Sequence, residues 1–192
     1  MTRFFGTRRA AGGWGIAFVV LLLVSATMVS LPTAAETGER IAAFYAAHGQ
    51  LIVLQQIVGV VALAAFVAFG LSLPPHLWLR PALWAFVACE LVTNLVPLVI
   101  VATNPSADAA HSWTIVEDLA DAALFISIAL FLSVATLTEP LWLRLAAYLV
   151  AVACVIRAVA TPFAVTALDQ IAPLLFVVFV LVLSIRLLVT SR

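Results

Sequence analysis

The chain has 192 residues, of which 66% are hydrophobic and only 9% are charged, and its mean hydropathy is +1.24. A soluble domain of this length needs a far larger polar surface, so the composition excludes that class and indicates a polytopic membrane protein. Nine arginines balance nine carboxylates, and a net charge of zero gives no support for nucleic-acid binding.

Six apolar segments are long enough to cross a bilayer, which takes about 20 residues. We therefore predict an all-α, polytopic membrane helix bundle with six transmembrane helices, forming a single domain over residues 1–192. The first apolar run is longer than the core of a signal peptide and is read as a retained helix. The segments are Trp14–Leu31, Gln50–Leu73, Pro81–Ala102, Thr114–Leu137, Leu145–Phe163 and Gln170–Val189.

Residues 36–49, between the first two segments, are long enough for a short helix of their own. Ile41, Phe44, Tyr45 and His48 recur there at helical spacing. We expect this short interfacial helix to lie on the outer surface of the membrane or to cap the bundle.

The arginines define an orientation for the predicted spans. With the N-terminus inside, seven of them lie at the cytoplasmic face, which obeys the positive-inside rule and makes both termini cytoplasmic in a multi-pass protein of the bacterial inner membrane. The tetrapeptide LWLR at 77–80 and 141–144 enters two of the spans from that face. It indicates interfacial anchoring, with arginines that reach lipid phosphates, or a duplicated hairpin. The seven are Arg3, Arg8, Arg9, Arg80, Arg144, Arg186 and Arg192.

The acids are the feature that topology does not explain. Glu117, Asp118 and Asp121 share a broad face of the fourth predicted helix, and Glu90 lies one turn from Asn94 near the middle of the third. Ionised groups are costly in hydrocarbon, so such residues usually have a partner or a function. Crowding at low dielectric favours a proton on at least one carboxyl group, and Arg157, the only deep cation, is the natural partner for another.

Each of these residues also has a structural interpretation. Acids in the first turn of a helix complement its dipole, Glu90 can be tied to Asn94, and Arg157 can be a counter-ion only. Pro97, Pro162 and Pro173 interrupt the outer halves of three spans and could open a vestibule there, with Asp169 and Gln170 at its mouth. The three histidines lie at helix ends and do not form the transmembrane pairs of a bis-histidine haem, and two isolated cysteines build neither a metal site nor a redox motif.

Aromatic rings could line the same volume, where their faces would stabilise a cation. For any single ring, packing or interfacial anchoring is the simpler interpretation. The candidates are Tyr45, Trp84, Phe86, Trp113, Phe125, Phe163 and Phe176.

Three stretches of the chain carry a resemblance. IAAFYAAHGQLIVLQQIVG, VEDLADAALFISIALFLSVATL and LWLRLAAYLVAVAC resemble a family of small six-span membrane proteins of actinobacteria. Their size and span number are similar to those of the bacterial membrane-bound terpene cyclases of the drimentine type, which act on farnesylated indole diketopiperazines.

The resemblance implies a membrane-embedded terpene cyclase that protonates a prenyl chain and cyclises it through carbocations without a metal or other cofactor. The chain lacks the DDxxD motif of magnesium-dependent cyclases. The implied catalytic residues are Asp121 or Glu117 as proton donor, Glu90 as its partner or the terminal base, and Asp118 beside them. The implied substrate-binding residues, for a lipophilic prenylated molecule, are Tyr45, Trp84, Asn94, Trp113, Phe125 and Arg157.

Two other functions fit the same residues. The acids could be counter-charges in a protein that binds or transports a lipophilic or cationic small molecule. They could instead be structural in an accessory subunit of a larger membrane complex.

Overall fold

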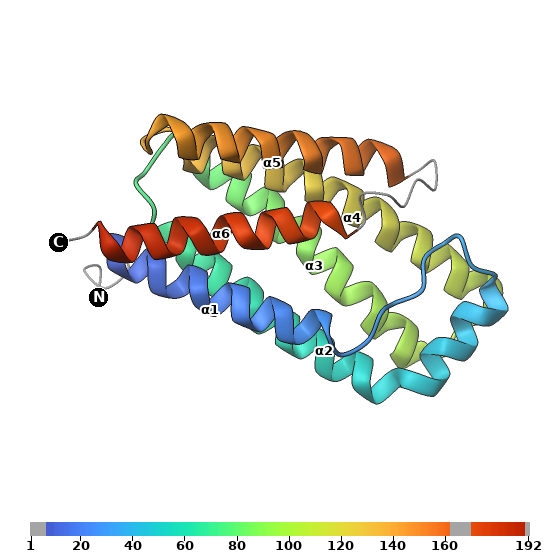
Figure 1. The fold of residues 1–192 in the computed structure, drawn as a ribbon. Coiled ribbons are helices and arrows are strands. Elements are labelled where there is room, and N and C mark those ends of the chain that lie inside the picture. The colour runs from blue at the N-terminus through green and yellow to red at the C-terminus, as the bar shows by residue number, and fades with distance from the viewer. Residues whose placement is uncertain (1–6, 162–169, 191–192) are drawn as a thin grey trace.

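A computed structural model describes residues 7–161 and 170–190 (Figure 1). Arg3, Pro162, Phe163, Asp169 and Arg192, which entered the predictions above, lie outside these ranges. The predicted all-α class is confirmed, since the described residues form six helices. They are α1 Arg8–Ala26, α2 Gly38–Ser72, α3 Leu79–Thr103, α4 Ala107–Ala135, α5 Leu141–Ala160 and α6 Ile171–Val189.

Five of these helices are long and apolar enough to cross a membrane, which supports a multi-pass membrane protein. The exception is α4, whose first half carries Asp108, Glu117, Asp118 and Asp121. The acids that suggested a function are thus the same residues that weaken the apolar signal of this helix.

The helices run side by side as a bundle, and the start of α1 lies at the same end as the end of α6 (Figure 1). Each helix packs against the next, α6 also packs against α1, and α2 contacts α4. We name the two ends by their charges. The arginine end holds Arg8, Arg80, Arg144 and Arg186, and the opposite acidic end holds Glu117, Asp118 and Asp121.

Phenylalanine rings form the centre of the main core. Phe66 of α2 is fully buried, and its ring centroid lies 4.2 Å from that of Phe86 and 4.8 Å from that of Phe18. Phe131 and Phe176 complete the contacts around it. Because lipid is as apolar as these side chains, close packing rather than water exclusion is what favours their association in a membrane.

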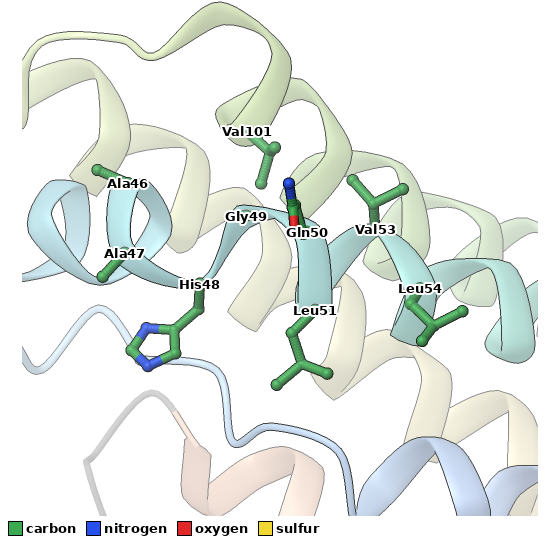
Figure 2. Close-up of a pocket in the computed structure, with 9 residues that line it drawn as sticks. All are labelled: Ala46, Ala47, His48, Gly49, Gln50, Leu51, Val53, Leu54 and Val101. Carbon is green, nitrogen blue, oxygen red and sulfur yellow. The ribbon is translucent and has the colours of Figure 1, made fainter.

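The short helix predicted at 36–49 is not a separate element. It is the first part of α2, a helix of 35 residues, which at 1.5 Å per residue is about 50 Å long and exceeds a hydrocarbon core of about 30 Å. The helix bends at Gly49, where an added Cβ would lie 3.2 Å from Val101 of α3 (Figure 2). We call residues 38–48 the α2 arm.

The α2 arm has a small hydrophobic core of its own at the acidic end. Ile41 and Tyr45 are buried there against Ile100 of α3 and Ala110 of α4. The arm is therefore packed onto the bundle as a cap, which is one of the two positions expected from the sequence.

Candidate functional site

Arg157 of α5, expected to pair with one of the deep acids, pairs with Asp121 of α4. A guanidinium nitrogen of Arg157 donates to a carboxylate oxygen of Asp121 at 2.7 Å, with side chains that are 12% and 32% exposed, respectively. The guanidinium carbon lies 3.8 Å from the centroid of the Phe125 ring. Asp121 and Phe125 are one turn apart on α4, so a single helical face supplies both a counter-charge and a π surface to one cation.

Glu117 lies one turn before Asp121 and has a different partner. The hydroxyl of Tyr45, a buried residue of the α2 arm, donates to a carboxylate oxygen of Glu117 at 3.4 Å. This contact joins the arm to α4. Both oxygens of the pair can donate or accept when the carboxyl group is protonated.

Asp118 has a structural contact. One of its carboxylate oxygens accepts the backbone N–H of Ala34 at 2.9 Å, and the Nε2 of His111 lies 3.1 Å from the Ala34 carbonyl oxygen. The backbone N–H and C=O groups of Ala34, in the α1–α2 loop, are thus both bound to side chains of α4. We infer that Asp118 positions the α1–α2 loop.

On α3, Asn94 binds Glu90 as the spacing suggested. Its side-chain amide donates to a carboxylate oxygen of Glu90 at 3.1 Å and to the Glu90 carbonyl at 2.7 Å. The side-chain oxygen Oδ1 of Asn94 faces Gly59 of α2, and a Cβ added to this glycine would lie 2.5 Å from that oxygen. Asp121 is close enough to act electrostatically on both Glu90 and Glu117, so α3 and α4 bring the three acids into one region.

The two tryptophans expected in the site lie on the surface of the bundle. Trp84 is 52% exposed and Trp113 is 39% exposed, whereas Phe86 and Phe176 belong to the phenylalanine core. An indole ring with an N–H at one edge favours the interface between lipid and water. Among the predicted aromatic residues that the structure describes, Tyr45 contacts Glu117 and Phe125 contacts Arg157.

An open groove runs along the bend of α2 beside the site. Its main part, about 940 Å³, is lined by residues 46–51, 53, 54 and 101, and Figure 2 shows His48, Leu51 and Leu54 on one side of the bent helix. A smaller part, of about 260 Å³, shares Ala46, Gly49 and Val101 with the main part and is also lined by Tyr45. Tyr45 therefore stands between the groove and Glu117.

A second charged cluster, which the sequence predictions missed, lies at the arginine end. Glu139, in the α4–α5 loop, is buried and accepts hydrogen bonds from Arg8 of α1 and, at 3.0 Å, from Arg186 of α6. One feature of the sequence could have indicated this cluster. Glu139 is a single acid at a predicted membrane face where arginines gather. Gln55 was also missed, and it donates to the carbonyls of Ser25 and Val29 at 3.1 and 2.8 Å, holding the end of α1 to α2.

Within the described ranges, no three His, Cys, Asp or Glu side chains are grouped to hold a metal ion. Comparison with known proteins gives no relative: no protein-family description, no curated protein and no solved structure matches the chain.

Proposed function

We propose that the protein is a membrane-embedded, proton-initiated terpene cyclase without a metal cofactor. In this proposal all six helices span the bacterial inner membrane, with both termini in the cytoplasm, and the substrate is a lipophilic prenylated small molecule. The observation that supports it best is the hydrogen-bonded pair of Tyr45 and Glu117 at the wall of the groove.

The groove suits a prenyl chain because its walls are mostly aliphatic. Leu51 and Leu54 are exposed beside it, and Val53 and Val101 complete its apolar lining. A prenyl chain that enters the groove from the lipid would reach Tyr45 in its smaller part.

The chemical roles divide between the acids by their partners. Glu117, in its protonated form, would pass a proton to a terminal alkene carbon with the Tyr45 hydroxyl as relay. The alkene π electrons form the new C–H bond, further alkenes close the ring, and Glu90 or Asp121 takes the final proton from the adjacent carbon. Substrate and product are then isomers, and proton exchange with water restores Glu117.

Asp121 and Glu117 were the two expected proton donors, and Asp121 is the less suitable of them. Its carboxylate accepts a short hydrogen bond from Arg157, and such charge-assisted bonds stabilise the anion. Arg157 and Phe125 would hold this carboxylate in place, and Asn94 would hold Glu90.

The test is turnover in membranes that contain the protein. Farnesylated indole substrates are supplied, and the products are separated and identified by mass and retention. Wild-type protein is expected to return cyclised isomers, whereas Glu117→Gln and Tyr45→Phe should reduce turnover at least about 100-fold, the ordinary contribution of a general acid.

Glu39→Gln is the matched control, since it makes the same change at an exposed acid in the first turn of α2. It should leave turnover unchanged. Well-folded wild-type protein that returns a panel of prenylated substrates unaltered would refute the cyclase proposal.

A structural role for the acids is the second candidate, and specific contacts favour it. Asp121 binds α5, Asp118 binds the α1–α2 loop, and Glu117 binds the α2 arm. Under this alternative, an accessory subunit, Glu117→Gln would lower thermal stability in detergent instead of abolishing a reaction.

A further inference from the structure

A cavity of about 310 Å³ lies at the arginine end, where α1 starts and the α2–α3 loop turns. It is on the opposite side of the membrane-spanning region from the groove and the acids, and it plays no part in the proposed reaction. Its lining residues are Arg8, Gly70, Leu71, Ser72, Leu73, Pro74, Pro75, His76, Leu79, Arg80 and Leu83.

The rim of this cavity is positively charged. Arg8 and Arg80 both line it, from the starts of α1 and α3. Arg8 shares the single carboxylate of Glu139 with Arg186, so that cluster keeps a net positive charge. Arg80 is exposed. The ion-pair partners of Glu139 are Arg8 and Arg186 rather than Arg80.

His76 adds a hydrogen-bonding group to the rim. Its Nδ1 accepts the backbone N–H of Trp78 at 3.3 Å, which places the proton of a neutral ring on Nε2. The rim therefore offers two guanidiniums and an N–H donor to an anion with several acceptor oxygens, the geometry that suits phosphate.

The inner wall of the cavity is apolar. Leu79 and Leu83 are buried, and Leu71 is exposed toward the surroundings of the bundle. The cavity lies where α2 ends and α3 begins, and both are candidate membrane spans. If both helices span the bilayer, a ligand there would meet cations at the level of the lipid headgroups and Leu71 at the level of the first acyl carbons.

We propose that this cavity binds an anionic phospholipid, with its phosphate between Arg8 and Arg80 and the start of one acyl chain against Leu71. The two charges favour a lipid of net negative charge over a zwitterionic one, because a basic residue near a membrane surface contributes about 1 kcal/mol to attraction of anionic lipid.

Native mass spectrometry of delipidated protein in detergent tests the proposal, with phosphatidylglycerol and phosphatidylcholine added separately. The first phosphatidylglycerol should bind more tightly than phosphatidylcholine. Arg80→Gln should weaken it about fivefold, which corresponds to the loss of one such charge. Arg80 is the better variant because Arg8→Gln would also disturb the contact with Glu139.

Arg9→Gln is the control, since it removes a charge from the same end at a residue that does not line the cavity. It should change binding less than twofold. Equal binding of the two lipids, or an Arg80→Gln protein that binds like wild type, would overturn the proposal. Displacement of phosphatidylglycerol by excess inorganic phosphate would overturn the lipid assignment and identify a site for free phosphate.

Discussion

At the scale of single residues, each of the four acids of the candidate site has a partner of different chemistry, and the partner limits what the acid can do. Asp121 accepts from a guanidinium, Asp118 from a backbone amide, Glu90 from an amide side chain on its own helix, and Glu117 from a phenol. Of these partners, only the phenol can return a proton to its acid. Glu117 is therefore the acid best placed for proton transfer.

The Asp121–Arg157 contact predicts a measurable coupling. Asp121→Asn should lower the free energy of unfolding by about 2 kcal/mol, because it leaves a mostly buried guanidinium without this carboxylate. Adding Arg157→Gln to Asp121→Asn should recover part of the loss, since no charge then remains at the site. Unfolding in mixed micelles measures the two single variants, Asp121→Asn and Arg157→Gln, and the double variant. Strictly additive effects of the two substitutions would show that the contact contributes nothing.

Glu139 predicts a larger loss of stability. Its carboxylate is almost fully buried between two guanidiniums, so Glu139→Gln should destabilise the protein by about 3 kcal/mol. The melting temperature in detergent is the measurement, with Glu39→Gln as the control for loss of one negative charge. Equal melting temperatures for the two variants would mean that the arginines find other partners.

The sequence allowed some of these contacts to be predicted. Arg157 was the only cation deep in a span, which restricted its partner to the few deep acids, and Asn94 lay one turn from Glu90. Glu139 was not singled out because it lies in a loop between two helices, where an acid is ordinary. Its burial depends on α1 and α6, which are distant in sequence.

At the scale of helices, the contact between α1 and α6 depends on glycine. An added Cβ on Gly12 would lie 2.6 Å from the backbone oxygen of Ser184, and one on Gly15 would lie 2.0 Å from the Ser184 hydroxyl oxygen. Small residues at such positions let two backbones approach closely. The bend of α2 was harder to predict, because no proline marks it and Gly49 is one of eight glycines in the chain.

Neighbouring glycines provide a matched pair for this contact. Gly12→Ala should destabilise the protein by about 2 kcal/mol, since backbone of α6 must move to admit the methyl group. At Gly13 nothing lies within 4 Å of an added Cβ, so Gly13→Ala should be neutral or stabilise by up to about 1 kcal/mol through helix propensity. Unfolding of the two variants side by side measures the difference. A stable Gly12→Ala protein would show that α1 and α6 can separate without cost.

At the scale of the whole molecule, the fold class and the approximate helix bounds could be predicted because length and hydropathy determine them. The sequence did not reveal that the α2 arm continues into the span. It also did not reveal that Trp84 and Trp113 lie on the surface, since helical periodicity is weak when most positions are apolar. The side of the membrane on which each end of the bundle lies is a prediction from the distribution of the arginines.

Cysteine labelling tests that orientation. In a protein with Cys89→Ala and Cys154→Ala, a cysteine placed by Glu39→Cys at the acidic end should react with a membrane-impermeant maleimide in intact cells. One placed by Leu77→Cys, at a residue that is 78% exposed at the arginine end, should react only after the cells are opened. The reverse pattern would place the termini outside.

The position of Glu139 has a consequence for biosynthesis. Its partners are Arg8, in α1, and Arg186, in α6. Both partners are present only after α6 has been synthesised, and the glycines of α1 that contact Ser184 likewise have their partner only then. Until then a nascent chain displays an incomplete charge cluster and an uncovered helix face.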